Sequence, residues 1–280
     1  MKYARPNQLE DALGLLANDH WSILAGGTDY FPTLRDQPST GNVLDLTQLG
    51  ELSHITNADG FLRIGALVTW TDLIKATLPP ALDGLKQSAR EIGSVQIQNR
   101  ATLVGNLCNA SPAADGVPPL LTLDASIELA SQRGKRQLPL SEFIQGSRQT
   151  DRHSDELVTA ILIPQACLLG VSAFSKLGFR KYLVISVSMV AIRLVSDSHD
   201  AVHEACISVG SCSAVAQRLN QLEQALVGQP LTESLADQVL AQHLTGLSPI
   251  DDVRAGKAYR IEATLALVKQ LLEQTRRLMR

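Results

Sequence analysis

The chain is poor in aromatic residues and in charge. Of its 280 residues only 4% are Phe, Trp or Tyr and 19% are charged, and the formal net charge is −3. A nucleic-acid-binding surface typically needs an excess of Lys and Arg, often with aromatic side chains on which bases stack. The composition therefore predicts no nucleic-acid partner. The hydrophobic content of 45% is typical of a globular protein with a sizeable core.

Long apolar runs are also absent from the sequence. One of the longest, Leu183–Leu194, is interrupted by Ser186, Ser188 and Arg193 and falls short of the ~20 residues of a membrane-spanning helix. The first residues, Met1–Asn7, lack the apolar stretch of a secretory signal. We therefore expect no membrane span and a cytoplasmic location.

The cysteines and histidines do not form a metal-binding pattern. Four cysteines stand at positions 108, 167, 206 and 212, with no Cys-x-x-Cys pair. Structural zinc and iron–sulfur sites usually contain such pairs, so we expect neither and predict free thiols. His199 and His203 have the spacing of a helical zinc pair, but their segment is predicted to be a turn entering a strand. No Gly-x-Gly-x-x-Gly motif occurs either, which argues against a Rossmann cofactor site.

Two patches of small residues stand out against this background. The first, Ile23–Asp29, follows a short apolar stretch, and the second, Thr102–Asp115, contains Gly105, Asn106 and Asn109. Glycine and alanine let backbone amides approach a ligand closely, while Asn and Asp offer short hydrogen-bonding groups. Two separated loops of this kind suit a large anionic cofactor whose pyrophosphate is bound by backbone N–H groups.

These patches resemble the FAD-binding subunit or domain of the molybdenum hydroxylases, the group of carbon monoxide dehydrogenase, xanthine dehydrogenase and aldehyde oxidoreductases. The family's Ala-Gly-Gly-Thr-Asp loop is matched at Ala25–Asp29. Its Gly-Asn-Leu loop is matched at Thr102–Leu107, and its Ala-Ser-Pro-x-x-Asp motif at Ala110–Asp115. One departure is Val104, which stands where the family usually has a first glycine.

The resemblance continues along nearly the whole chain. Asp155–Pro164 is similar to the strand that closes the family's flavin domain, and Phe174–Arg180 is similar to the start of its C-terminal domain. Asp251–Arg260 resembles the family's Asp-x-Arg-x-x-x-x-Tyr-Arg helix. Several ordered matches are far more specific than a single glycine motif.

The resemblance implies an α+β fold with two domains. Residues 1–168 would form an FAD-binding domain of the vanillyl-alcohol-oxidase or PCMH type, with two small subdomains. Residues 169–280 would form a C-terminal domain with an antiparallel sheet and helices. The sequence pattern agrees, since strands and helices alternate without a clean βαβ repeat, and 182–195 and 201–210 are predicted to be antiparallel strands. Helices are predicted over 81–92, 214–227, 232–245 and 255–279.

The resemblance also implies a set of FAD-binding residues. Asp115 would hydrogen-bond to the flavin side of FAD, although an Asp at this place also suits the N-cap of the next helix. Lys176 would lie against the isoalloxazine ring, where a cation stabilises the reduced anion; its alternative is a solvated lysine. Ile92 and Val158 would either contact the flavin or belong to the core. The predicted FAD-binding residues are Leu24, Ala25, Gly26, Gly27, Thr28, Asp29, Ile92, Thr102, Gly105, Asn106, Cys108, Asn109, Asp115, Val158 and Lys176.

The sequence contains no Ser/His/Asp or Cys/His arrangement typical of a catalytic nucleophile, which fits a protein whose chemistry belongs to its cofactor. The resemblance implies an electron-transfer subunit of a molybdopterin-dependent hydroxylase or dehydrogenase. A molybdopterin-binding large subunit would oxidise the substrate, and a small subunit with [2Fe–2S] clusters would relay electrons to FAD. The acceptor would be NAD⁺, a quinone or oxygen. Two alternatives stay open: a free-standing flavin oxidase of the same fold, and a binding or assembly protein that has lost redox function.

Overall fold

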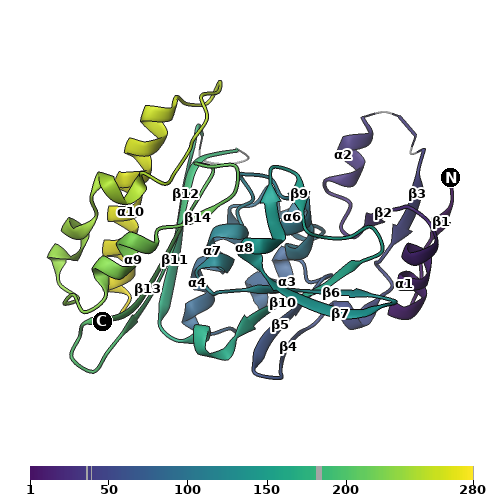
Figure 1. Ribbon diagram of the computed structural model, residues 1–280, viewed down its shortest axis with the longest axis horizontal. Helices are drawn as coiled ribbons and strands as arrows, with labels where there is room; N and C mark the ends of the chain where they lie inside the picture. The colour runs from purple at the N-terminus through teal and green to yellow at the C-terminus, as the bar shows by residue number, and fades with distance from the viewer. Residues whose placement is uncertain (36, 39, 181–184, 280) are drawn as a thin grey trace. The chain divides into compact units, whose positions relative to one another are not determined.

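A computed structural model describes residues 1–35, 37–38, 40–180 and 185–279 (Figure 1). By its internal contacts the chain divides into two compact units that interleave along the sequence. Unit 1 comprises Met1–Lys75, Ser94–Ala110 and Ala125–Pro164. Unit 2 comprises Ala76–Gly93, Ser111–Asp124 and Gln165–Arg280. The predicted α+β class is confirmed, and the residues 182–184 of one predicted strand lie outside the described part.

Unit 1 contains two main sheets, in keeping with the two small subdomains expected. The first is a three-stranded parallel sheet in the order β1-β3-β2, and the second is a five-stranded antiparallel sheet in the order β4-β5-β10-β6-β7. The strands of unit 1 are β1 Tyr3–Ala4, β2 Trp21–Leu24, β3 Asn42–Asp45, β4 Ile55–Ala58, β5 Phe61–Gly65, β6 Ser126–Ser131, β7 Gly134–Pro139, β8 Ile144–Gly146, β9 Gln149–Thr150 and β10 Leu157–Pro164. Its helices are α1 Leu9–Asn18, α2 Tyr30–Leu34, η1 Gly50–Leu52, α3 Trp70–Lys75, α5 Val95–Gln98, α6 Leu103–Asn109 and α8 Leu140–Phe143.

Unit 2 is a four-stranded antiparallel sheet in the order β11-β12-β13-β14, with helices packed on both faces. Its strands are β11 Val171–Gly178, β12 Ser186–Ser196, β13 Val202–Gly210 and β14 Gln217–Arg218. Its helices are η2 Pro80–Leu82, α4 Asp83–Arg90, α7 Val117–Leu121, η3 Gln165–Leu168, α9 Asn220–Leu226, η4 Glu233–Gln238, η5 Ala241–Leu244 and α10 Lys257–Arg277.

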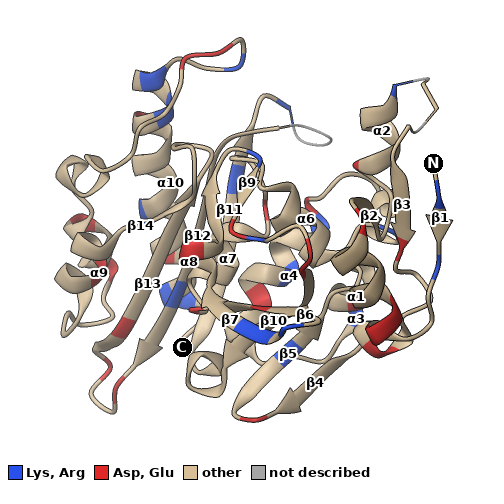
Figure 2. Cartoon of the chain, turned by 45° about the vertical axis from the view of Figure 1, so that its right-hand side comes forward, with Lys and Arg blue, Asp and Glu red and all other residues tan. Residues whose placement is uncertain are grey.

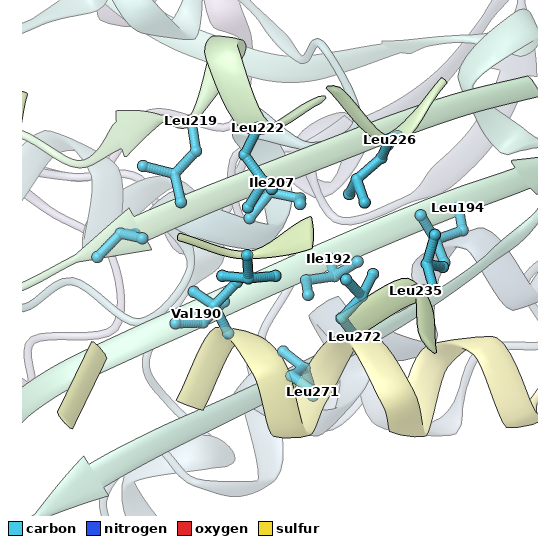
Figure 3. Packing of buried hydrophobic residues seen from close by; sticks show 14 of the residues in the cluster. Val190, Ile192, Leu194, Ile207, Leu219, Leu222, Leu226, Leu235, Leu271 and Leu272 are labelled. Carbon is cyan, nitrogen blue, oxygen red and sulfur yellow. The ribbon is translucent and has the colours of Figure 1, made fainter. Parts of the chain in front are cut away.

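The core of unit 2 explains the apolar sequence of β12. Val190, Ile192 and Leu194 alternate along the strand and pack in one cluster with leucines of α9 and α10, as Figure 3 shows. Met189 and Ala191, which point to the other face, pack in a second cluster. A strand covered on both faces presents apolar side chains on both, and the polar residues that interrupt its sequence, such as Ser188 and Arg193, are buried with hydrogen-bond partners.

This packing also explains why the units interleave. The segments 76–93 and 111–124 provide α4 and α7, which pack on β11, β12 and β13. A sheet left bare on one face would expose its apolar side chains, so these two segments complete the core of unit 2. The connection between β10 and β11 lies at the place where the sequence suggests a boundary, and a division at residue 168 stays a prediction.

The helix predictions are confirmed in part. Helix α10 agrees with 255–279, whereas 81–92 divides into η2 and α4. The prediction over 214–227 is too long, because Gln217 and Arg218 pair with β13 and only α9 is helical. The prediction over 232–245 is wrong: this segment forms two short 3-10 helices, and the Leu240 amide between them donates to the His243 ring instead of continuing a helix. None of the described helices is long and apolar enough to cross a membrane.

Candidate functional site

The predicted FAD-binding residues are divided between the two units. Unit 1 holds the first loop, residues 102–110 of the second patch and Val158, while unit 2 holds residues 111–115 of that patch together with Ile92 and Lys176. From here on, residues 102–110 are called the second loop. Lys and Arg are interspersed with Asp and Glu in both units, as Figure 2 shows. The predicted residues thus form two groups. The loop site of unit 1 comprises residues 25–29 and 102–110, and the charged site of unit 2 comprises Asp115 and Lys176.

The first loop, residues 25–29, connects β2 to α2 and lies against the main chain that precedes α6. A Cβ on Gly26 would be 1.9 Å from the carbonyl oxygen of Arg100, so only glycine permits this approach. Gly27 has a φ of +76°, in the left-handed region that favours glycine. The two glycines thus have separate structural reasons, one to bring the two loops together and one to make the turn.

The second loop begins as a helix that Thr102 caps. The Thr102 hydroxyl accepts a hydrogen bond of 2.9 Å from the Gly105 amide, which is the usual N-cap interaction. Gly105 and Cys108 are exposed and Asn109 is half-buried, so one side of α6 is open. Val104, the departure from the family pattern, is only 6% exposed, so its side chain belongs to the core and does not occupy the open side.

The amides of the first loop are available to a ligand. Among the described residues, the amides of residues 26–29 donate no hydrogen bond to another part of the chain. Successive unpartnered N–H groups in a glycine-containing turn form a concave site for an anion. No side chain larger than Thr occurs at residues 25–28. These residues fit the pyrophosphate of FAD.

Arg148 joins the two loops, and the sequence reasoning missed it. It lies in the turn between β8 and β9, and its Nη1 is 3.4 Å from the Asp29 carboxylate and also donates to the Asn109 side chain. Its own amide donates to the Ala110 carbonyl oxygen over 2.8 Å. The only sequence signal was a basic residue in a turn, which by itself has no specific meaning.

In unit 2, Lys176 and Asp115 form an ion pair. The Lys176 Nζ is 3.0 Å from Asp115 Oδ2 and 3.0 Å from the Glu91 carbonyl oxygen. The two side chains are only 7% and 13% exposed. The alternative of a solvated lysine is therefore wrong, because this ammonium is held among protein atoms.

The surroundings of Asp115 also exclude the capping role. Helix α7 has Gly116 as its N-cap and receives no side-chain hydrogen bond there. The Asp115 carboxylate instead accepts from Lys176 and from the Ser186 hydroxyl, at 3.2 Å, a contact that sequence reasoning missed. Burial raises the pKa of the Asp115 carboxyl above its ordinary value, although Lys176 and Ser186 lower it in part. The carboxylate needs its cation to stay charged in this place.

Lys176 also lines a cavity of about 600 Å³ in unit 2. Arg90, Glu91, Phe174 and Arg180 contribute to the same walls. The volume lies within the range of small-molecule sites, and the walls carry charged groups beside the Phe174 side chain. The structure thus puts a protein-held cation at the wall of a hollow, and a flavin ring against that wall stays a prediction.

Ile92 and Val158 differ in exposure. Ile92 is half-buried and follows Glu91 at the end of α4. Val158 is 3% exposed, and in β10 it is paired with Leu129 of β6. Within its unit Val158 therefore has a core role, and a contact of this residue with the flavin stays a prediction.

The chain is similar over its whole length to known flavoproteins. Residues 1–166 match the family described as FAD binding domain in molybdopterin dehydrogenase, and residues 173–275 match the CO dehydrogenase flavoprotein C-terminal domain. The nicotinate dehydrogenase FAD-subunit of Eubacterium barkeri is 32% identical over 96% of this chain and 94% of its own. The xanthine dehydrogenase FAD-binding subunit of Escherichia coli O157:H7 is 31% identical over 97% of this chain and 94% of its own. In the structure of reconstituted CO dehydrogenase from Oligotropha carboxidovorans, one chain superposes with a TM-score of 0.88 at 26% identity, covering 99% of this chain and 97% of that one.

Proposed function

Because this chain belongs to the FAD-binding medium subunits of the molybdenum hydroxylase family and binds FAD, we propose that it is the electron-transfer subunit of a molybdopterin-dependent hydroxylase or dehydrogenase complex. Its partners would be a molybdopterin-binding large subunit and a small subunit with [2Fe–2S] clusters, and its acceptor NAD⁺, a quinone or oxygen. The observation that carries the proposal is the match along nearly the whole chain to relatives named as FAD subunits of dehydrogenases.

In this proposal the two loops of unit 1 bind the pyrophosphate. The unpartnered amides of residues 26–29 donate to phosphate oxygens. The open side of α6, with Gly105, Cys108 and Asn109, lets the cofactor approach closely. Residues 1–168 would form the FAD-binding domain and 169–280 the C-terminal domain. Bound FAD supplies two-electron redox chemistry, while the protein positions it and adjusts its potential.

In this proposal the Lys176–Asp115 pair of unit 2 contacts the flavin ring of FAD. An ammonium has three N–H donors, and two from Lys176 are used by Asp115 and the Glu91 carbonyl. The third is available to an acceptor atom of the flavin. Asp115 orients this donor and partly offsets its charge, so that Lys176 acts as a fixed hydrogen-bond donor with a moderated positive field.

Flavin retention and metal analysis test this function together. The purified chain should retain about one FAD after desalting, and acid precipitation should release that flavin because it is bound without a covalent link. The complex purified through a tag on this chain should contain molybdenum and iron. Flavin that stays attached to the precipitate would favour a free-standing oxidase, and a chain that retains no flavin would favour the assembly protein.

A further inference from the structure

Arg148 places a positive charge beside two loops that contain no cationic side chain. The loop segments 25–29 and 102–110 contain no Lys or Arg, and their one charged residue is Asp29. A pyrophosphate beside these loops would therefore meet a carboxylate and no cation of the loops themselves. Arg148 is within hydrogen-bond distance of both Asp29 and Asn109, so it supplies the missing charge.

The backbone keeps this arginine in position. Its φ of +60° is rare for a residue with a side chain, and its amide is bonded to the carbonyl oxygen of Ala110, the residue that ends α6. The turn between β8 and β9 is thus fastened to the end of the second loop. An arginine presented in this way loses less freedom on binding than a side chain on a mobile loop.

The Arg148 guanidinium has N–H groups that are not used within the described part of the chain. Among the described residues, Nη1 is its only atom that bonds to another part of the chain, and the side chain is 59% exposed. Nε and Nη2 together form the planar edge that matches two oxygens of a phosphate. The exposed ion pair between Arg148 and Asp29 adds little to the stability of the fold. We therefore attribute the fixed position of the guanidinium to ligand binding.

We propose that Arg148 is a further FAD-binding residue, which Asp29 and Asn109 orient so that Nε and Nη2 bind the pyrophosphate. The inference rests on the proposed role of the two loops. It differs from that proposal because it concerns a residue outside both motifs and because it requires the phosphate part of FAD, not the flavin ring.

Titration of the chain without flavin, using FAD and riboflavin, tests the inference. Arg148→Met should weaken FAD binding by about 10- to 100-fold, as for a lost charge-assisted hydrogen bond, and leave the affinity for riboflavin, which has no phosphate, within about twofold. The FAD affinity of Arg148→Lys should lie between those of the wild type and Arg148→Met, because an ammonium keeps the charge but not the planar edge. The matched control is Arg133→Met, since Arg133 is 63% exposed, lies in unit 1 and also pairs with an Asp.

Two results would overturn the inference. One is an unchanged FAD affinity in Arg148→Met, and the other is an equal loss of FAD and riboflavin, which would mean that Arg148 only holds the loops. If Arg148→Met does not fold, as judged by circular dichroism, the same comparison in Arg148→Lys decides. A wild-type chain that binds neither flavin would instead count against the proposed function.

Discussion

Replacement of Lys176 by Met is the most direct probe of the charged site. Met keeps the length of the side chain and removes the ammonium, which leaves Asp115 with the Ser186 hydroxyl as its remaining side-chain partner. Both members of the pair are largely buried, at 7% and 13% exposure. Breaking such a pair leaves an uncompensated buried charge, so unfolding of unit 2 should become easier by about 3 kcal/mol. Folding should therefore suffer, although a lysine stem by itself tolerates Met.

The loss of stability in Lys176→Met should be larger at high pH than at low pH. Burial already raises the pKa of Asp115 in the folded protein, and Lys176 is the first of the groups that lower it. In Lys176→Met the pKa rises further, so between the unfolded and folded pKa values the folded state binds more protons than the unfolded state. Stability then falls as pH increases through this window. The variant should be weakest near pH 8 and closer to the wild type near pH 5.

Urea unfolding at these two pH values measures the effect. Circular dichroism reports the helices of both units, including α10, while the fluorescence of Trp21 and Trp70 reports unit 1. A shift of the circular dichroism curve without a shift of the fluorescence curve is therefore assigned to unit 2. Both proteins are compared at one FAD concentration, because bound ligand adds stability. The urea midpoint of unit 2 should fall by roughly 1–2 M at pH 8.

Two controls make the result specific. Lys2→Met removes an Asp-paired lysine with the same 3.0 Å separation but side chains that are 70% and 40% exposed, and should change stability little. The double variant Lys176→Met with Asp115→Asn removes both charges and should recover most of the loss. An unchanged midpoint in Lys176→Met, or a larger loss at pH 5 than at pH 8, would refute the reasoning.

Three further predictions concern FAD and the loops. Gly27→Val should abolish FAD retention after desalting, because φ is +76° and a Cβ would be 2.7 Å from the Phe31 ring; stoichiometric flavin in this variant would remove the first loop from the site. Gly26→Ala should lower the melting temperature of unit 1, measured by tryptophan fluorescence, since its Cβ would be 1.9 Å from a main-chain oxygen; a wild-type value would mean that the loops separate at little cost. In the FAD-loaded protein, Lys176→Met should lower the two-electron potential by roughly 20–45 mV, the effect of ~1–2 kcal/mol. A redox titration checks this, and an unchanged potential would mean that Lys176 does not act on the flavin.

Local features were predictable from the sequence because they depend on near neighbours. The glycines of the first loop and the Thr102 segment were recognised as a cofactor-binding pattern, and the helix predicted over 255–279 is present as α10, Lys257–Arg277. Helix limits were less predictable. The end of a helix depends on pairing elsewhere, as the residues 217–218 that join β13 demonstrate.

The sequence by itself determined the family, the cofactor and the two loops, since motif residues and their order carry that information in one dimension. Only the tertiary structure decided which groups meet. Lys176 and Asp115 are 61 positions apart, and Arg148 and Asp29 are 119 apart. No local periodicity links such residues, because their contact depends on how strands and helices pack. The same packing buries the Lys176–Asp115 pair and leaves Arg148 exposed, and burial determines how strongly a charge interacts.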